Sequence, residues 1–207
     1  MNRKIKVLIA DDHAVVRIGL AALFGTEKDM QVVGQAKDGD DAISQATAVH
    51  PDVIIMDLRM PKTDGANATK QIHDRLPSAK VVILTSYGES DGVAHALAAG
   101  ASGAISKAAE DAVLVSVVRR VAEGEQYVSP EIRKLLQDSP PIPKMTSRQL
   151  EILAYMVKGL TNKDIAGLLN IREDSVEEHV NLILAKIGAA NRTEAVAIAL
   201  RKHLLKI

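Results

Sequence analysis

The chain contains no cysteine and no tryptophan, and its aromatic residues are one phenylalanine and three tyrosines. The lack of cysteine excludes disulfide bonds and thiolate metal sites, and it fits a reducing compartment. With so few aromatic side chains, any hydrophobic core must be built from aliphatic residues. Apolar runs are too short for a membrane span, and the one near the start is too short for a signal-peptide core. We therefore expect a soluble cytoplasmic protein.

The formal net charge is zero, because 26 basic residues balance 26 acidic ones over 207 residues. The balance changes along the chain, since the part from Lys144 onward has ten Lys or Arg against seven Asp or Glu. The front is therefore slightly acidic and the back slightly basic. This small polarity suits a carboxylate site in front and an anionic partner behind. The length allows one or two domains with ordinary cores.

The first part of the chain alternates between strand and helix patterns. Apolar runs at 5–10, 31–34, 53–56, 80–84 and 103–106 predict five buried strands, and helical periodicity fills the segments between them. This alternation predicts an α/β domain with a doubly wound, five-stranded parallel sheet and helices on both faces. We expect this domain to cover residues 1–124.

The second part of the chain has a different pattern. Residues 125–143 predict a helix, over 130–137, followed by a stiff linker with three prolines in its last four residues. Residues 144–207 show no strand pattern and predict a small all-α domain of four short helices. A tight helix pair around Asn170 predicts a helix-turn-helix.

Residues suited to capping mark the expected starts of these four helices. Thr146 with Gln149 has the pattern of a capping box at the first helix. Thr161 is expected to open the second helix, and Ser175 the third. Either Asn191 or Thr193 opens the last one.

Four of the five predicted strands end at a charged or hydroxyl side chain. Asp11 and Asp12 follow the first strand, Asp57 the third, Thr85 the fourth and Lys107 the fifth. These groups should converge, because the crevice of a doubly wound sheet lies beyond the carboxyl ends of its strands. Three carboxylates suit Mg²⁺, which prefers oxygen ligands. Together they predict a phosphorylation site with Asp57 as the nucleophile.

These residues carry a resemblance to a known family. Asp11, Asp12, Asp57, Thr85 and Lys107 resemble the receiver domain of two-component response regulators, as do the neighbouring Met60, Pro61 and Gly65. The segments 145–153, 159–166, 176–180, 186–188 and 191–195 are similar to the LuxR-type helix-turn-helix domain. In this order, the two domains cover nearly the whole chain and resemble the NarL/FixJ-type response regulators.

The resemblance implies a function and a set of partners. It implies that the main-chain carbonyl of Arg59 joins the Mg²⁺ ligands, that Lys107 pairs with the phosphoryl group, and that the Thr85 hydroxyl turns to hydrogen-bond it. A sensor histidine kinase would be the phosphodonor. The output would be transcription control through double-stranded DNA, by a homodimer when phosphorylated. Such a protein is not an enzyme beyond slow self-phosphorylation and self-dephosphorylation.

One position departs from the family pattern. Receivers of this type commonly carry an aromatic switch residue three positions before the lysine, where this chain has Ala104. Tyr87, two residues after Thr85, is the nearest aromatic residue in sequence. We expect it to take over part of the switch and to shield the phosphoryl group from water, which would prolong the life of the phosphoprotein.

The third helix of the rear domain is expected to meet DNA with an unusually acidic face. Family members commonly place basic or polar side chains at the position of Glu177. The acids could instead accept hydrogen bonds from cytosine, and Asn181 could read adenine. The candidate DNA contacts are Lys158, Lys163, Arg172, Ser175, Glu177, Glu178, Asn181, Lys186 and Arg192. The last helix suggests a dimer contact through Ala195, Ile198 and Ala199, although core packing alone also accounts for such residues.

Simpler interpretations exist for each motif taken singly. Asp12 alone fits a helix cap, Thr85 a turn residue and Lys107 a solvated charge. The acidic third helix also fits a protein-interaction module that has kept the helix-turn-helix fold without DNA binding. A phosphotransferase is a weaker alternative, because no substrate-pocket motif or general acid accompanies Asp57. The histidines are scattered without metal-ligand spacing.

Overall fold

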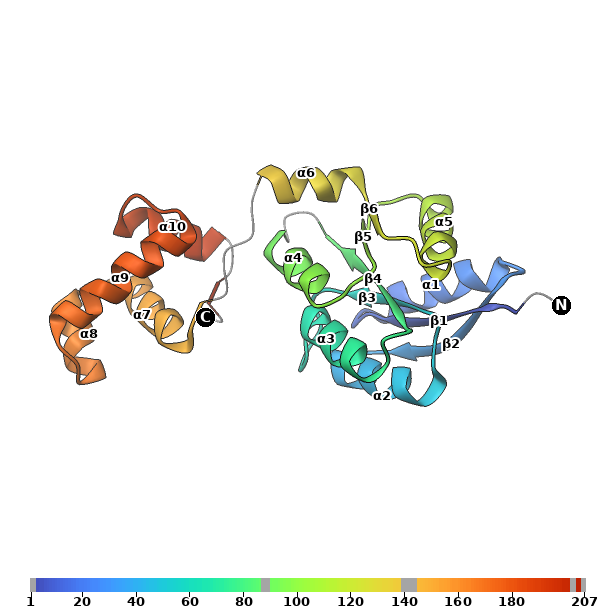
Figure 1. Cartoon of the computed structure of the whole chain (residues 1–207), viewed down its shortest axis with the longest axis horizontal. Coiled ribbons are helices and arrows are strands. Elements are labelled where there is room, and N and C mark those ends of the chain that lie inside the picture. Colours follow the sequence, from blue (N-terminus) through green and yellow to red (C-terminus); the bar gives the residue numbers. More distant parts are fainter. Residues whose placement is uncertain (1–2, 87–89, 139–144, 202–203, 206–207) are drawn as a thin grey trace. The chain divides into compact units, whose positions relative to one another are not determined.

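The computed structural model describes residues 3–86, 90–138, 145–201 and 204–205 (Figure 1). The chain divides into two compact units, Met1–Pro140 and Pro141–Ile207. Each unit has a hydrophobic core of its own. The first unit is an α/β sandwich, and the second consists of helices.

Six parallel strands form the sheet of the first unit, in the order β2-β1-β3-β4-β5-β6. They are β1 (Ile5–Ala10), β2 (Met30–Ala36), β3 (Val53–Asp57), β4 (Lys80–Thr85), β5 (Gly103–Ser106) and β6 (Tyr127–Val128). The predicted doubly wound parallel sheet is confirmed, but the number of strands was one too low. The missed strand, β6, has two residues, which is too short to show any hydrophobic alternation.

Helices cover both faces of this sheet. The helices α1 (Ala14–Thr26) and α5 (Asp111–Ala122) share one core with Val7 and Ile9 of β1. On the other face, α2 (Gly39–Val49), α3 (Gly65–Arg75) and α4 (Ser90–Ala98) share a second core with Leu8 and Ala10. Because both faces are covered, the central strands are apolar at nearly every position, which explains the continuous apolar runs in the sequence.

The segment after α5 packs against the first unit. The amide of Ser129 donates to the carbonyl of Ala104, and α6 (Pro130–Asp138) contacts α4 and β5. The side chain of Ile132 is buried in the same core as Ala104. The first compact unit thus extends beyond residue 124, where the sequence placed the end of the domain, because β6 and α6 pack against the sheet. The predicted proline-rich linker falls on residues 139–144, which lie outside the described residues.

The second unit contains the four predicted helices: α7 (Ser147–Val157), α8 (Asn162–Leu169), α9 (Glu173–Ile187) and α10 (Arg192–Arg201). Thr146 and Thr161 open α7 and α8 as predicted; the predicted capping box at Thr146 is present, and Thr161 forms another one with Asp164. The predicted start of α9 at Ser175 is wrong, because the helix begins two residues earlier with Arg172 as its N-cap. Within the described part of the chain, no helix has the length and apolar character needed to cross a membrane.

Candidate functional site

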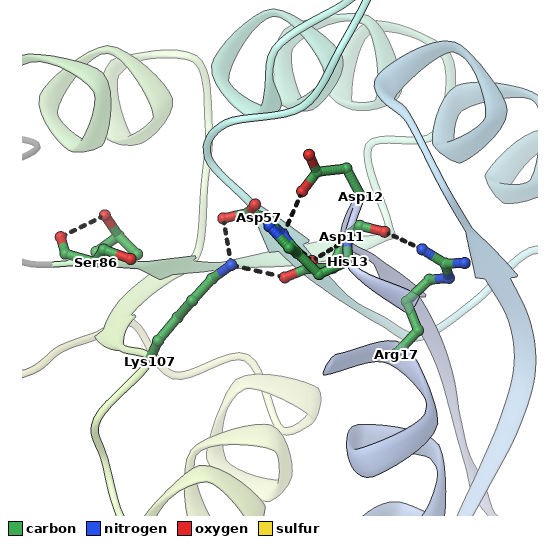
Figure 2. A network of polar contacts seen from close by, with 8 residues as sticks. Asp11, Asp12, His13, Arg17, Asp57, Ser86 and Lys107 are labelled. Atoms are coloured by element: carbon green, nitrogen blue, oxygen red, sulfur yellow. Dashed lines mark hydrogen bonds and ion pairs between the residues drawn. The ribbon is translucent and has the colours of Figure 1, made fainter. Parts of the chain in front are cut away.

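The charged side chains predicted to converge do meet at the carboxyl ends of the strands (Figure 2). Asp57 is the last residue of β3, Asp11 directly follows β1, and Lys107 directly follows β5. The residues Asp11 and Asp57 are buried, with exposed fractions of 1% and 4%. The Asp12 side chain is exposed at the rim of this cluster. The neighbouring strands β1 and β3 lie where the strand order reverses, which is the place where doubly wound sheets bind ligands.

Lys107 connects the two buried carboxylates. Its Nζ lies 2.7 Å from Oδ2 of Asp11 and 3.0 Å from Oδ1 of Asp57. Burial raises the pKa of Asp57, and the hydrogen bond and charge of Lys107 offset only part of that rise. Burial lowers the pKa of Lys107, but its hydrogen bonds to Asp11 and Asp57 outweigh this effect, so its pKa lies above the usual value. One ammonium group therefore serves two buried acids.

Residues at the start of α1 hold Asp11 and Asp12 in place. The main-chain amide of His13 donates to Oδ1 of Asp11 at 2.8 Å, and Nη1 of Arg17 donates to the carbonyl of Asp11 at 2.7 Å. The Nδ1 atom of His13 lies 2.7 Å from Oδ1 of Asp12. Sequence reasoning had set His13 aside with the other histidines, although its position next to Asp12 was a usable signal.

The cluster has the chemistry of a divalent-cation site. One ligand atom from each of Asp11, Asp12, Asp57 and His13 lies within 4.8 Å of the others. The carboxylates supply the hard oxygen donors that Mg²⁺ prefers. Arg59, whose main-chain carbonyl was predicted as a further ligand, lies in the loop two residues after Asp57 and has an exposed side chain.

Two of the three predicted switch residues, Thr85 and Ala104, lie on the neighbouring strands β4 and β5. Thr85 ends β4 and is fully buried, and its hydroxyl donates to the carbonyl of Ser86 at 3.1 Å. Ala104 is buried in β5, in the core that also contains Ile132 of α6. Tyr87 lies outside the described residues. Helix α6 therefore packs on β5 near Ala104, the position where receivers of this type commonly carry the switch aromatic.

The second unit presents the predicted acidic helix face. The turn between α8 and α9 passes through Asn170, whose φ of 50° lies in the left-handed region that asparagine tolerates. On α9, side chains at five positions are exposed: Glu177, Glu178, Asn181, Leu182 and Ala185. The first turn of α9 adds the acids Glu173 and Asp174. The surface of this helix is thus acidic toward its N-terminus.

The basic residues around α9 fall into two groups. Lys158, Lys163 and Arg172 are exposed, and Arg172 forms a surface ion pair with Asp174. Lys186 is half-buried and donates to Gln149 at 2.9 Å. The guanidinium of Arg192 donates to the Oδ1 atom of Asn162 and to the carbonyl of Leu160, and burial lowers its pKa. Arg192 therefore braces the loop before α8.

The predicted dimer residues do not face outward. Ala195, Ile198 and Ala199 have exposed fractions of 0%, 8% and 1%, and all three belong to the core of the second unit. Their burial favours core packing, the simpler interpretation of these residues, because α7 and α9 already contact α10. The spacing of apolar residues along α10 reflects core packing. Exposed apolar surface on this helix includes Leu200, which is 47% exposed.

Comparison with known proteins gives matches along the whole chain. A family model for the response regulator receiver domain matches residues 7–119, and a model for bacterial regulatory proteins of the luxR family matches residues 143–199. The chain is 38% identical to the response regulator protein VraR of Staphylococcus epidermidis over 98% of this chain and 99% of that protein. It is 37% identical to VraR of Staphylococcus aureus, with the same shares of both chains covered.

Solved structures also match over nearly the whole chain. A crystal structure of the response regulator ChrA, from a heme-sensing two-component system, has 34% sequence identity and a TM-score of 0.59. The match covers 98% of this chain and 99% of the ChrA chain. A structure of the two-component response regulator RcsB with DNA has a TM-score of 0.67 at 22% identity, covering 96% of this chain and 99% of that one. At that identity it supports the fold alone.

Proposed function

This chain belongs to the response regulators that join a receiver domain to a LuxR-type DNA-binding domain, and we propose that Asp57 is its phosphoryl acceptor. Membership of this family makes it a phosphorylation-controlled transcription regulator. We assign the receiver to residues 1–124, with β6 and α6 as its extension, and DNA binding to residues 144–207. The observation that carries the assignment of Asp57 is the shared ammonium of Lys107, which lies within 3.0 Å of two buried carboxylates.

The transfer step is a nucleophilic displacement at phosphorus. A carboxylate oxygen of Asp57 attacks the phosphorus of the phosphodonor, and an acyl phosphate forms as the bond to the leaving group breaks. We propose the phosphohistidine of a sensor histidine kinase as the donor, so that the P–N bond breaks and the released imidazole takes a proton from solvent. Small phosphodonors would permit slow self-phosphorylation. The protein is the acceptor in this step and turns over no other substrate.

Asp11, Asp12 and Asp57 would hold Mg²⁺ together with the carbonyl of Arg59. This assignment is supported by the clustered oxygen ligands, because Mg²⁺ takes carboxylate, carbonyl and water oxygens. When bound, Mg²⁺ supplies positive charge that offsets the charge on the transferring phosphoryl group. His13 and Arg17 keep Asp11 and Asp12 directed toward the cluster through the contacts at the start of α1.

Lys107 and Thr85 respond to the new group. After phosphorylation, Nζ of Lys107 exchanges its contact with the Asp57 carboxylate for one with a phosphoryl oxygen. The Thr85 hydroxyl leaves the Ser86 carbonyl and donates to another phosphoryl oxygen. Since Ala104 has no ring to follow this movement, we propose that Tyr87 takes part of the switch role. That proposal rests on the position of Tyr87 in the sequence.

The output is DNA binding by the helix pair α8 and α9. We propose the exposed Lys163 and Arg172 as phosphate contacts, because such contacts supply much of the affinity of DNA-binding proteins. On α9, Asn181 is the candidate for adenine, while Glu177 and Glu178 can accept hydrogen bonds from cytosine. We propose that the phosphorylated protein binds as a homodimer, because helix-turn-helix dimers recognise two-fold symmetric operators.

One observation favours a second function for the rear unit. Glu177 and Glu178 are both exposed on α9, next to the exposed acids Glu173 and Asp174. Acidic side chains repel DNA phosphates, and Leu182 adds an exposed apolar side chain to the same helix. The alternative is a receiver-controlled protein-interaction module without an operator.

A selection experiment separates the two functions. The full-length protein is incubated with Mg²⁺ and acetyl phosphate, and its binding to a pool of random DNA duplexes is selected over several rounds and titrated with salt. We expect enrichment of a two-fold symmetric motif, tighter binding after phosphorylation, and loss of this tightening in Asp57→Asn. Asp74→Asn, which changes an exposed acid of α3, is the matched control.

Each result has a clear meaning. Phosphorylation on Asp57 without an enriched motif at any salt concentration would contradict the DNA-binding output and favour the protein-interaction module. Equal phosphorylation of Asp57→Asn would instead contradict the assignment of the acceptor residue.

A further inference from the structure

The loop from Leu58 to Asp64 directly follows Asp57 and takes a strained path. It begins at the end of β3 and closes on itself, because the amide of Gly65 donates to the carbonyl of Leu58 at 2.9 Å. Within it, Lys62 has a φ of 63°. This is the left-handed region, which a residue with a long side chain enters only when its surroundings hold it there. The neighbours of Lys62 should therefore show what holds it.

The neighbour that holds Lys62 is Asp38, at the start of α2. Nζ of Lys62 donates to Oδ2 of Asp38 at 2.7 Å, and the Asp38 side chain is only 4% exposed. The other carboxylate oxygen caps α2 by accepting from the amide of Asp41 at 2.9 Å. The hydrogen bond to Lys62 lowers the pKa of Asp38 and raises that of Lys62. Each oxygen of this buried acid thus has a defined partner.

A second pair of contacts presses the same loop against α2. The hydroxyl of Thr63 donates to Oδ1 of Asp40 at 2.6 Å. The backbone of Gly39 lies so close to the carbonyl oxygen of Thr63 that a Cβ atom on Gly39 would overlap with it. Because backbone meets backbone here, the loop cannot move closer to the first turn of α2 without displacing it.

The first turn of α2 is in turn tied to the phosphorylation site. Asp38 lies two residues beyond the end of β2, and the carbonyl of Ala36 at that end accepts from the amide of Asp11 at 3.2 Å. The loop after Asp57 is therefore connected through Lys62 and Asp38 to the strand end that carries Asp11. It contains Arg59, whose carbonyl is the proposed cation ligand.

We propose that the ion pair between Lys62 and Asp38, which we call the latch, positions this loop for uptake of the divalent cation. Both residues are then positioning residues for phosphorylation of Asp57. The inference rests on the proposed function of Asp57. Its physical basis is that ligands of a metal ion tolerate little displacement, and groups behind them commonly change metal affinity about 10- to 100-fold. An exposed ion pair would contribute little, but here one partner is buried and the other is held at a positive φ.

The test compares five variants of the full-length protein with the parent. Lys62→Met and Asp38→Asn remove the ion pair, and Asn retains an oxygen that can cap α2. Lys62→Gly removes the same pair while relieving the positive φ, so the fold should keep its stability. Arg3→Met breaks the ion pair between Arg3 and Asp52 at the opposite ends of the strands and is the matched control. Phosphorylation by acetyl phosphate is followed against Mg²⁺ concentration, and Mg²⁺ binding is measured directly by calorimetry.

We expect the three latch variants to need about tenfold more Mg²⁺ for half-maximal phosphorylation, with a maximal rate within about twofold of the parent. Calorimetry should show the same loss of Mg²⁺ affinity. Lys62→Arg, which keeps the charge, should restore most of it, and Arg3→Met should behave like the parent. If the ion pair had a purely structural role, Lys62→Met would lower the free energy of unfolding. The Mg²⁺ concentration for half-maximal phosphorylation would then not rise separately from the maximal rate.

Two results would overturn the inference. One is a Mg²⁺ requirement within twofold of the parent in all three latch variants, and the other is a lower maximal rate with unchanged Mg²⁺ affinity. The proposed function fails in a different way, through absence of phosphorylation in the parent or its persistence in Asp57→Asn. The two failures are therefore distinguishable in the same set of reactions.

Discussion

Asp57 and Asp11 bring two carboxylates into the interior of the receiver with one ammonium group between them. Taking charged groups out of water costs free energy that their mutual attraction offsets only in part, so such clusters are costly to the fold. Burial raises the pKa of Asp57, which shows that its charged form is disfavoured in the folded protein. The same strain favours any event that adds positive charge at this place, such as cation binding.

Asp57→Asn should make the receiver more stable at neutral pH in the absence of Mg²⁺. Because the pKa of Asp57 is higher in the folded protein than its usual 3.8, the folded state binds the proton more tightly than the unfolded chain. Stability is therefore lost as the pH rises from 3.8 through the raised value, and it stays low above that value. Removing the charge restores what was lost. The urea midpoint at pH 7 should rise, and the gain should shrink as the pH falls toward 3.8.

Two controls accompany this measurement. Asp74→Asn removes an exposed acid from α3 and should leave the urea midpoint unchanged. Adding Mg²⁺ should stabilise the parent more than Asp57→Asn and so narrow the difference between them. A urea midpoint that is lower in Asp57→Asn at pH 7 would show that the Lys107 contact outweighs burial of the charge.

At the scale of elements, α9 combines a buried apolar side with an acidic exposed one. Glu177→Lys with Glu178→Lys should strengthen DNA binding that does not depend on sequence. Two new phosphate contacts should make the slope of log affinity against log salt concentration steeper by about 2. The measurement is a salt titration on a fixed duplex by fluorescence anisotropy.

The matched control for this pair of substitutions lies on α7. Glu151→Lys reverses the charge of an exposed acid that pairs with Arg148 at 2.9 Å, and it should leave the salt slope unchanged. If the double variant of α9 had the slope of the parent, α9 would not be the helix that faces DNA.

Elements differ in how far the sequence could predict them. The site was predictable because Asp57, Thr85 and Lys107 each stand at the end of a short buried strand, and a parallel sheet brings such ends to one edge. Thr146 and Thr161 were predictable because a capping box depends on residues three positions apart. Local patterns of this kind are visible without a structure.

Other features depend on tertiary contacts that no local pattern reports. Ser175 is a favoured capping residue, but the acids Glu173 and Asp174 also suit the first turn of a helix, and α9 begins there. Ala199 fits a dimer contact and a core equally well until burial is known. The latch at Lys62 combines a positive φ with a partner 24 positions away, and neither is visible in the sequence.

At the scale of the whole molecule, the two units have separate cores. The apolar clusters on the two faces of the sheet contain residues of the first unit, and Ile152, Leu153 and their neighbours form the cluster of the second. We therefore expect two unfolding transitions in calorimetry of the full-length protein. Asp57→Asn should move one of them, and Arg192→Ala the other.

The size of the shift expected for Arg192→Ala follows from the hydrogen bonds that Arg192 makes to the start of α8 and the loop before it. Losing its hydrogen bonds to Asn162 and Leu160 should cost about 1–3 kcal/mol and lower the transition of the second unit by roughly 5 °C or more. Lys163→Ala, at an exposed position on α8, should move neither transition. A single transition that shifts with both variants would mean that the units unfold as one.

The short strand β6 has a consequence for how copies of this protein can associate. It pairs with only two residues of β5 and is soon followed by Pro130, which has no amide hydrogen, so it offers almost no template for strand addition. At the opposite edge, the Gln45 side chain donates to the carbonyl of Gln35 in β2 at 2.9 Å and occupies part of that template as well. Both borders of the sheet are thus protected against amyloid-like growth. The homodimer proposed for the phosphorylated protein would then have to form through helices, whose contacts do not extend the sheet.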